Sequence, residues 1–112
     1  MPGSHGRPLA GAFAPDLILH TGQGITSVAE LMHTARPVPL DLADRPDLRE
    51  TVRNWHHRVD ILTAKTDLRP ADALLIRPDG HVVWAAGLDE SAGSATPPLR
   101  EALSVWFGTP NI

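Results

Sequence analysis

Two short apolar runs flank a turn at residues 73–86 and predict a β-hairpin. One arm covers residues 74–76 and the other covers residues 82–84. Because each arm is apolar at consecutive positions, we expect other parts of the chain to cover both faces of the hairpin. The intervening turn predicts a three-residue loop, in which proline presets φ and glycine supplies the left-handed residue; its residues are Pro78, Asp79 and Gly80.

Helical and strand patterns alternate ahead of this hairpin. We expect strands at 17–20, 38–42 and 58–64, a turn at 22–24, and helices at 28–34, from 47 to about 57, and from 97 to 107. The first helix has a capping box at Ser27 and Glu30, and Asp47 is expected to cap the second helix. A loop at 87–95 precedes the last helix, which Thr96 is expected to cap. The order β-α-β-α-β-β-α predicts an α/β domain with a mixed sheet and helices on both faces.

Each expected helix has one apolar face. The predicted inward residues are Val28, Leu31 and Met32 in the first helix, Leu48, Val52 and Trp55 in the second, and Leu99, Ala102, Leu103, Trp106 and Phe107 in the last. Gly108 then suits a left-handed stop. We expect Trp55 and Trp106 to lie in the core, whereas Trp84 faces either the last helix or a partner.

The domain boundaries follow from the glycine and proline content. Residues 1–14 lack periodicity and are interpreted as an irregular lead-in or linker remnant. The folded domain is expected at 15–108, followed by a tail at 109–112.

Composition excludes several classes of function. The absence of cysteine removes disulfides, thiolate metal sites and Cys-x-x-Cys redox chemistry. A net charge of −3 with scattered signs argues against a nucleic-acid surface. Because no run reaches the roughly 20 apolar residues of a membrane span and no signal pattern opens the chain, we expect a cytoplasmic protein without membrane contact.

The element order is that of the thioredoxin-like fold, and several motifs are more specific. They are Ala-Pro-Asp-Leu at 14–17, Arg-Pro-Val-Pro-Leu-Asp-Leu at 36–42, Trp55 with Arg-Val-Asp at 58–60, residues 74–84 with Arg-Pro-Asp-Gly, Ala-Leu at 102–103, and Trp-Phe-Gly at 106–108. From about Pro8 to Gly108 the chain resembles the C-terminal domain of FAD-dependent aromatic polyketide hydroxylases, which are relatives of para-hydroxybenzoate and phenol hydroxylases. The resemblance implies a thioredoxin-like domain without redox cysteines and with a structural or interactive role. At His81 the family usually has tyrosine, and we expect this difference to alter a surface contact.

The resemblance assigns the cofactors to another part of the full-length enzymes. Those enzymes bind FAD through a Gly-x-Gly-x-x-Gly motif, which this chain lacks, and use NAD(P)H. The pair Gly22 and Gly24 has no third glycine and no strand–helix context. We therefore expect no cofactor and no catalytic residue in this chain.

Candidate sites in the chain are interpreted mainly as structural. His56 and His57 diverge on a helix, and His20, His33 and His81 are scattered, so no metal site is expected. A turn and a helix cap explain the acidic cluster of Asp41, Asp44 and Asp47 better than a hard-cation site does. Arg77 and Asp79 are expected to form a turn-stabilising pair rather than a substrate site. Trp84 and His81 are the residues expected at an interface.

These observations favour a stand-alone, non-catalytic C-terminal domain that serves packing, association or dimerisation. Its partner would be a flavin-binding monooxygenase module or a second copy of the chain. One alternative is an accessory part, acting in trans, of an FAD- and NAD(P)H-dependent aromatic hydroxylase. A weaker alternative is a small-ligand carrier with a pocket between the sheet and the last helix.

Overall fold

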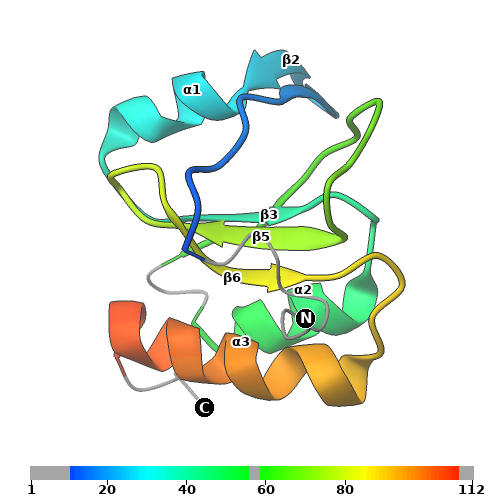
Figure 1. Cartoon of the computed structure of the whole chain (residues 1–112), viewed down its shortest axis with the longest axis vertical. Coiled ribbons are helices and arrows are strands. Elements are labelled where there is room, and N and C mark those ends of the chain that lie inside the picture. Colours follow the sequence, from blue (N-terminus) through cyan, green and yellow to red (C-terminus); the bar gives the residue numbers. More distant parts are fainter. Residues whose placement is uncertain (1–10, 56–58, 109–112) are drawn as a thin grey trace.

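A four-stranded mixed sheet forms the middle layer of the computed structural model, which describes residues 11–55 and 59–108 (Figure 1). Its spatial order is β4 (Leu62–Thr63), β3 (Val38–Asp41), β5 (Ala73–Ile76) and β6 (Val82–Ala86). β3 runs parallel to β4 and antiparallel to β5, and β5 is antiparallel to β6. The predicted mixed sheet is therefore confirmed.

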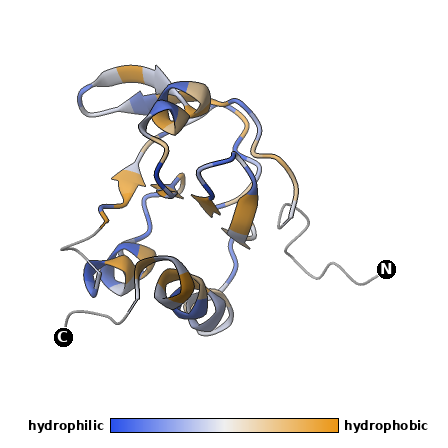
Figure 2. Cartoon of the chain, turned by 90° about the vertical axis from the view of Figure 1, so that its left-hand side faces the viewer, coloured by the Kyte–Doolittle hydropathy of each residue, from blue (hydrophilic) through white to orange (hydrophobic). Residues whose placement is uncertain are grey.

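Helices cover both faces of this sheet. On one face lie α2 (Pro46–Arg53) and α3 (Ala92–Phe107), side by side (Figure 1). On the other face lies a separate hairpin of β1 (Ile18–Thr21) and β2 (Gly24–Ser27), followed by α1 (Val28–Leu31) and the 3₁₀ helix η1 (Met32–Thr34). Figure 2 shows the central strands as apolar, between these two layers. This arrangement confirms the α/β, thioredoxin-like prediction.

The β5–β6 hairpin is buried on both faces, as its sequence predicts. All four residues of β5 are buried, and side chains at alternate positions belong to opposite core clusters. Leu74 and Ile76 pack towards the β1–β2 layer, whereas Leu75 and its cross-strand partner Trp84 pack towards α2 and α3. At the turn, Gly80 has a φ of +94° and its N–H donates to the Arg77 carbonyl at 2.8 Å.

Two strand predictions are wrong. The first strand does not join the central sheet but pairs with β2, which begins at Gly24, the last residue of the expected turn. The strand expected at 58–64 contains only β4, at Leu62–Thr63, and residue 58 lies outside the described residues. The Asp41 carbonyl accepts from the Ala64 N–H, so alternation along β3 directs the Pro39 backbone nitrogen to the same side. Because proline has no N–H, Pro39 cannot donate a hydrogen bond to the neighbouring strand, and the pairing of β3 with β4 stays short.

The first helix is placed correctly and the start of the second is not. α1 and η1 together cover 28–34, and the Ser27 hydroxyl accepts from the Glu30 N–H at 3.2 Å. The Glu30 carboxylate accepts instead from the Thr26 hydroxyl, so only half of the capping box forms. In α2 the N-cap is Arg45, which makes Asp47 a first-turn residue rather than the predicted cap. α2 ends at Arg53, and the histidines at 56 and 57 lie outside the described residues.

The last helix begins five residues before the predicted position. α3 starts at Ala92 with Ser91 as N-cap, and both Pro97 and Pro98 lie inside it. The Ser91 carbonyl accepts from the Ala95 N–H at 2.9 Å, so a helical turn forms before the prolines. The Thr96 hydroxyl donates to the Ala92 carbonyl within the helix and does not cap it. Gly108 follows with a φ of +80°, as expected of the stop.

The tryptophans differ in burial. Trp55 is buried as predicted, and its indole N–H donates to the Gly108 carbonyl at 2.8 Å. Trp84 lies against α3, where its indole N–H donates to the Ala95 carbonyl at 3.2 Å. The core placement predicted for Trp106 is wrong, because 39% of this residue is exposed. Its position continues the apolar pattern of α3, but Leu99 and Leu103 already fill the contact with the sheet.

Candidate functional site

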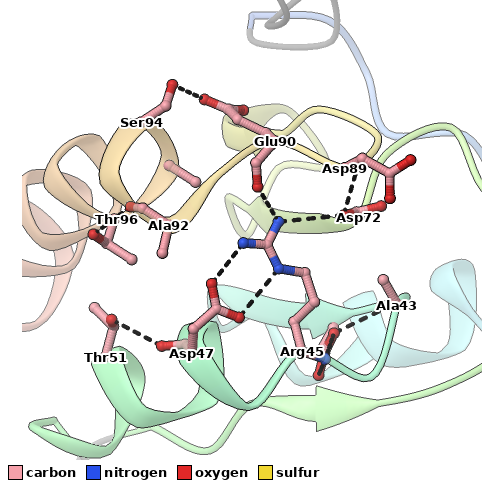
Figure 3. Close-up of polar contacts among 12 residues, drawn as sticks. Ala43, Arg45, Asp47, Thr51, Asp72, Asp89, Glu90, Ala92, Ser94 and Thr96 are labelled. Carbon is pink, nitrogen blue, oxygen red and sulfur yellow. Dashed lines mark hydrogen bonds and ion pairs between the residues drawn. The ribbon is translucent and has the colours of Figure 1, made fainter.

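Two buried carboxylates lie where the central sheet meets the helices. Asp41 ends β3 and is fully buried, and Asp72 precedes β5 and is 2% exposed. With Arg45, Asp47 and Arg49 they form what we call the carboxylate–arginine network. Figure 3 shows Arg45 between Asp47 and Asp72. Buried carboxylates are expected to be paired, catalytic or metal-binding, so their partners decide what this site can do.

Asp41 is saturated by the start of α2. Its carboxylate accepts from the backbone N–H of Arg45 at 2.9 and 3.0 Å and from that of Ala43 at 3.2 Å. The Arg49 guanidinium donates to the same group at 2.7 Å and also pairs with Asp44 at 2.8 Å. The helix N-terminus, where a thiolate or another anion would be stabilised, is thus already occupied by a carboxylate of the chain.

Arg45 connects the network to distant segments. Its Nη1 lies 3.2 Å from Asp72 Oδ2 and 2.5 Å from the Glu90 carbonyl oxygen, while its Nε and Nη2 form a bidentate pair with Asp47 (Figure 3). The hydrogen bond from Arg45 lowers the pKa of Asp47 and raises that of Arg45, so both groups stay charged at neutral pH. Arg45 therefore ties α2 to β5 and to the loop that enters α3.

Asp72 is satisfied by groups from three directions. Besides Arg45, the Arg69 Nε lies 3.3 Å from Oδ1 and the Asp89 N–H donates to Oδ2 at 3.0 Å. Both buried carboxylates therefore have ionic and backbone partners, as buried polar groups need. The network holds segments together. Asp41 accepts from amides of the turn, as the interpretation of the acidic cluster expects, whereas Asp47 pairs with Arg45 and does not cap the helix.

A second polar group surrounds the β5–β6 turn. Arg77 and Asp79 form a close bidentate pair, and the Asp79 carboxylate also accepts from the His81 N–H at 3.1 Å. The hydrogen bond from Arg77 holds the pKa of Asp79 well below its ordinary value. This is the turn-stabilising pair expected from the sequence.

The two residues expected at an interface have different environments. Trp84 is 3% exposed and contacts α3, which is the first of its two expected placements and leaves little of it for a partner. The His81 side chain is 30% exposed and lies at the end of the β5–β6 hairpin. Its ring stacks on Phe13, with 4.0 Å between ring centroids and a 30° interplanar angle. Residues 11–14, expected to be irregular, thus contact the hairpin.

A groove of about 860 Å³ opens beside the start of β3. Its lining residues are Leu31, Thr34, Arg36, Pro37, Val38, Pro39, Val59, Asp60, Leu62 and Phe107. The space between the sheet and α3, where a ligand carrier would need its pocket, is filled by the buried side chains Leu75, Trp84, Leu99 and Leu103.

The glycine pair Gly22 and Gly24, within the described residues, does not fit a flavin site. Gly22 and Gly24 lie in the turn and the second strand of the antiparallel β1–β2 hairpin. A dinucleotide diphosphate requires a glycine-rich turn between a strand and a helix, so that the helix N-terminus faces the phosphates. Two described helices follow strands of the central sheet. α2 has Asp41 at its N-terminus, where a carboxylate repels phosphate. α3 follows β6 after residues 87–91, which contain the single glycine Gly87 and so do not form a glycine-rich turn.

Comparison with known proteins assigns the chain to a family. A family model described as "Aromatic-ring hydroxylase, C-terminal" matches residues 7–110. The chain belongs to this family. It is 36% identical, over 98% of its length, to 12-dehydrotetracycline 5-monooxygenase/anhydrotetracycline 6-monooxygenase of Streptomyces rimosus. It is 39% identical, over 88% of its length, to a dialkyldecalin synthase of Streptomyces rugosporus.

A solved structure supports the same assignment. The chain superposes on the anhydrotetracycline hydroxylase OxyS from Streptomyces rimosus with a TM-score of 0.76 and 35% identity, over 98% of this chain and 22% of OxyS. It covers 22% of the tetracycline relative and 19% of the synthase, so the chain spans about a fifth of the curated relatives it matches. It corresponds to the C-terminal domain of aromatic polyketide hydroxylases.

Proposed function

We propose that this aromatic-ring hydroxylase C-terminal domain is a non-catalytic association domain. Its partner is a flavin-binding monooxygenase module or a second copy of the chain. The observation that carries the proposal is the saturation of both buried carboxylates, Asp41 and Asp72, by arginines and backbone amides. Groups tied in this way stabilise a fold and are not placed to act on a substrate.

The variety of the relatives supports this proposal. The same kind of domain is found in proteins named as a monooxygenase and as a dialkyldecalin synthase, at 36% and 39% identity. A domain shared by proteins with different reactions is expected to supply packing rather than reacting groups, because the chemistry resides in particular side chains and cofactors. FAD and NAD(P)H would then belong to the partner module, and this domain would affect hydroxylation only through association.

The first experiment tests whether the chain is non-catalytic. The purified protein is titrated with FAD while tryptophan and flavin fluorescence are followed, and NADPH oxidation is measured with an aromatic substrate. We expect no saturable FAD binding and no oxidation above the rate without protein. Saturable binding of FAD would refute the proposal.

The second experiment tests association. Sedimentation velocity is measured for the chain alone and with the flavin-binding part of a related monooxygenase that lacks its own C-terminal domain. We expect either a stable complex or a dimer, and His81→Ala should weaken it because the partly exposed His81 side chain lies at the expected interface. His33→Ala, at an exposed histidine in η1, is the matched control and should leave association unchanged. A monomer that ignores the flavin-binding part would contradict the proposal.

A further inference from the structure

Residues 11–14 lie against the β5–β6 turn and against Val82, the first residue of β6. The Gly11 N–H donates to the Val82 carbonyl at 2.8 Å, the Val82 N–H donates to the Ala12 carbonyl at 2.9 Å, and the Ala14 N–H donates to the Gly80 carbonyl at 2.8 Å. Phe13 and His81 are directly opposed in an antiparallel bridge. We call residues 11–14 the strap.

Backbone hydrogen bonds alone hold a short edge segment weakly, because water competes for the same groups and the ends of a chain fray. Ala14 packs against the core on the side of the β1–β2 layer, but Phe13 remains 69% exposed. Its specific side-chain contact is the stack of Phe13 on His81, at 4.0 Å between ring centroids. This ring pair is therefore the part of the contact that a single substitution can remove.

The turn holds the imidazole in place for this contact. The Asp79 carboxylate accepts from the His81 N–H, and Asp79 Oδ1 lies 3.2 Å from the ring nitrogen Nδ1. Nδ1 is buried and has no aligned hydrogen-bond partner among the residues that the structure describes. Arg77 in turn fixes Asp79. The turn, which the Arg77–Asp79 pair stabilises, thus positions the histidine ring against Phe13.

We infer that the strap is a rigid connector and that His81 is the positioning residue that holds it on β6. In the longer relatives, where this kind of domain lies at the C-terminal end, such a strap would fix the direction in which the chain enters the domain. A module preceding it would then be held beside the β5–β6 turn rather than on a flexible linker. The test below uses the chain without a partner, so its outcome does not depend on the proposed association.

Amide hydrogen exchange of the full chain, followed by NMR, tests the inference without any flavoprotein. The reporters are the amides of Gly11 and Ala14 in the strap and that of Val82 in β6, since each donates across the contact. In the native chain we expect all three to exchange at least about tenfold more slowly than unstructured amides, as docked segments do. In His81→Ala the protection should fall about three- to tenfold, because the stabilisation that an aromatic pair supplies is lost.

Two further variants separate the ring contact from general damage. His81→Phe keeps an aromatic ring and should keep the protection within about twofold of the native chain. Ile25→Ser changes an exposed residue of β2 and should leave the strap amides unchanged. The amide of Leu75 in the buried strand β5 reports whether the core survives in each variant.

Unprotected Gly11 and Ala14 amides in the native chain would overturn the inference. Equal protection in His81→Ala and the native chain would overturn the role of His81. If the exchange protection of the Leu75 amide in His81→Ala falls as much as that of the strap amides, this result would also count against the role of His81. The substitution would then act on the whole domain.

Discussion

Replacing Arg45 by methionine tests whether the carboxylate–arginine network holds the domain together. The substitution keeps an unbranched side-chain stem and removes the guanidinium bonds to Asp72, Asp47 and the Glu90 carbonyl. Asp72 is the decisive one, because its side chain is only 3% exposed and cannot recover full hydration. Breaking a buried ion pair costs about 3–5 kcal/mol when one charge is left alone. Here Asp72 keeps Arg69 and the Asp89 amide, so we expect a loss of about 2–3 kcal/mol.

The assay is urea unfolding followed by tryptophan fluorescence, since Trp55 and Trp84 are buried in the native state. For a domain of this size the expected loss corresponds to a melting temperature lower by about 10 °C. Arg100→Met, at an exposed position of α3, is the matched control and should change stability by less than about 0.5 kcal/mol.

A double-mutant cycle then isolates the ion pair. Asp72→Asn alone should also destabilise the fold, whereas Arg45→Met combined with Asp72→Asn should lose less than the sum of the two. We expect a coupling energy of about 1–3 kcal/mol, as for residues in one network. A coupling near zero, or a loss below about 0.5 kcal/mol for Arg45→Met, would refute the reasoning.

Three other outcomes follow from the described contacts. Gly80→Ala should destabilise the domain by about 1–2 kcal/mol in thermal melting, because alanine is strained at a φ of +94°. Steric overlap is not the cause, since the nearest atom to a new Cβ is Phe13 Cδ1 at 3.7 Å. An unchanged melting temperature would contradict this prediction. Leu103→Ala, at a fully buried position, should cost about 2–5 kcal/mol in urea unfolding, whereas the matched Val105→Ala at a position 75% exposed should cost little; equal losses would show that the contact with the sheet is not tight. The pKa of Asp79 is lowered in the folded state from 3.8, so its contribution to folding stability is present above about pH 4 and is lost as the pH falls. The stability difference between the native chain and Asp79→Asn should therefore shrink on acidification. A difference that is the same at pH 2.5 and pH 7 would contradict this prediction.

Local signals in the sequence account for the parts of the fold that were predicted correctly. The β5–β6 hairpin combines two apolar runs with a turn whose residues have fixed conformational preferences, and both signals lie within fourteen positions. The helix at 28–34 is likewise marked by Ser27 beside its first residue. In each case the information needed to form the element lies next to it in the chain.

Long-range contacts explain the errors. A Pro-Pro pair ordinarily opens a helix, yet α3 begins earlier, where the Ala95 carbonyl is held by the indole of Trp84. The length of β4 depends on which side of β3 the Pro39 nitrogen faces, and this is settled only by the pairing itself. The sequence pattern of a single segment does not contain either piece of information.

The site could be predicted even less completely. Asp41 and Asp47 stand out in the sequence as acidic residues close together, but the sequence does not show that they pair with Arg49 and Arg45. Arg45 reaches Asp72 across 27 positions and the Glu90 carbonyl across 45, and nothing near Arg45 signals those partners. The contact of Phe13 with His81 joins a segment that resembles a linker to the far end of the hairpin. A buried charge pattern becomes recognisable only when the fold brings its members together.

The two borders of the central sheet have a consequence for how the domain behaves outside a larger protein. A strand with unpaired backbone groups recruits other strands, and proteins avoid aggregation by keeping such strands short or covered. In the described chain one border is β4, which contributes only two residues to the ladder, and the other is β6, whose first residue, Val82, is bonded to residues 11 and 12. The β4 border therefore offers a poor template for intermolecular β-pairing, and a substitution that frees residues 11–14 should expose the start of β6 and increase the tendency to aggregate.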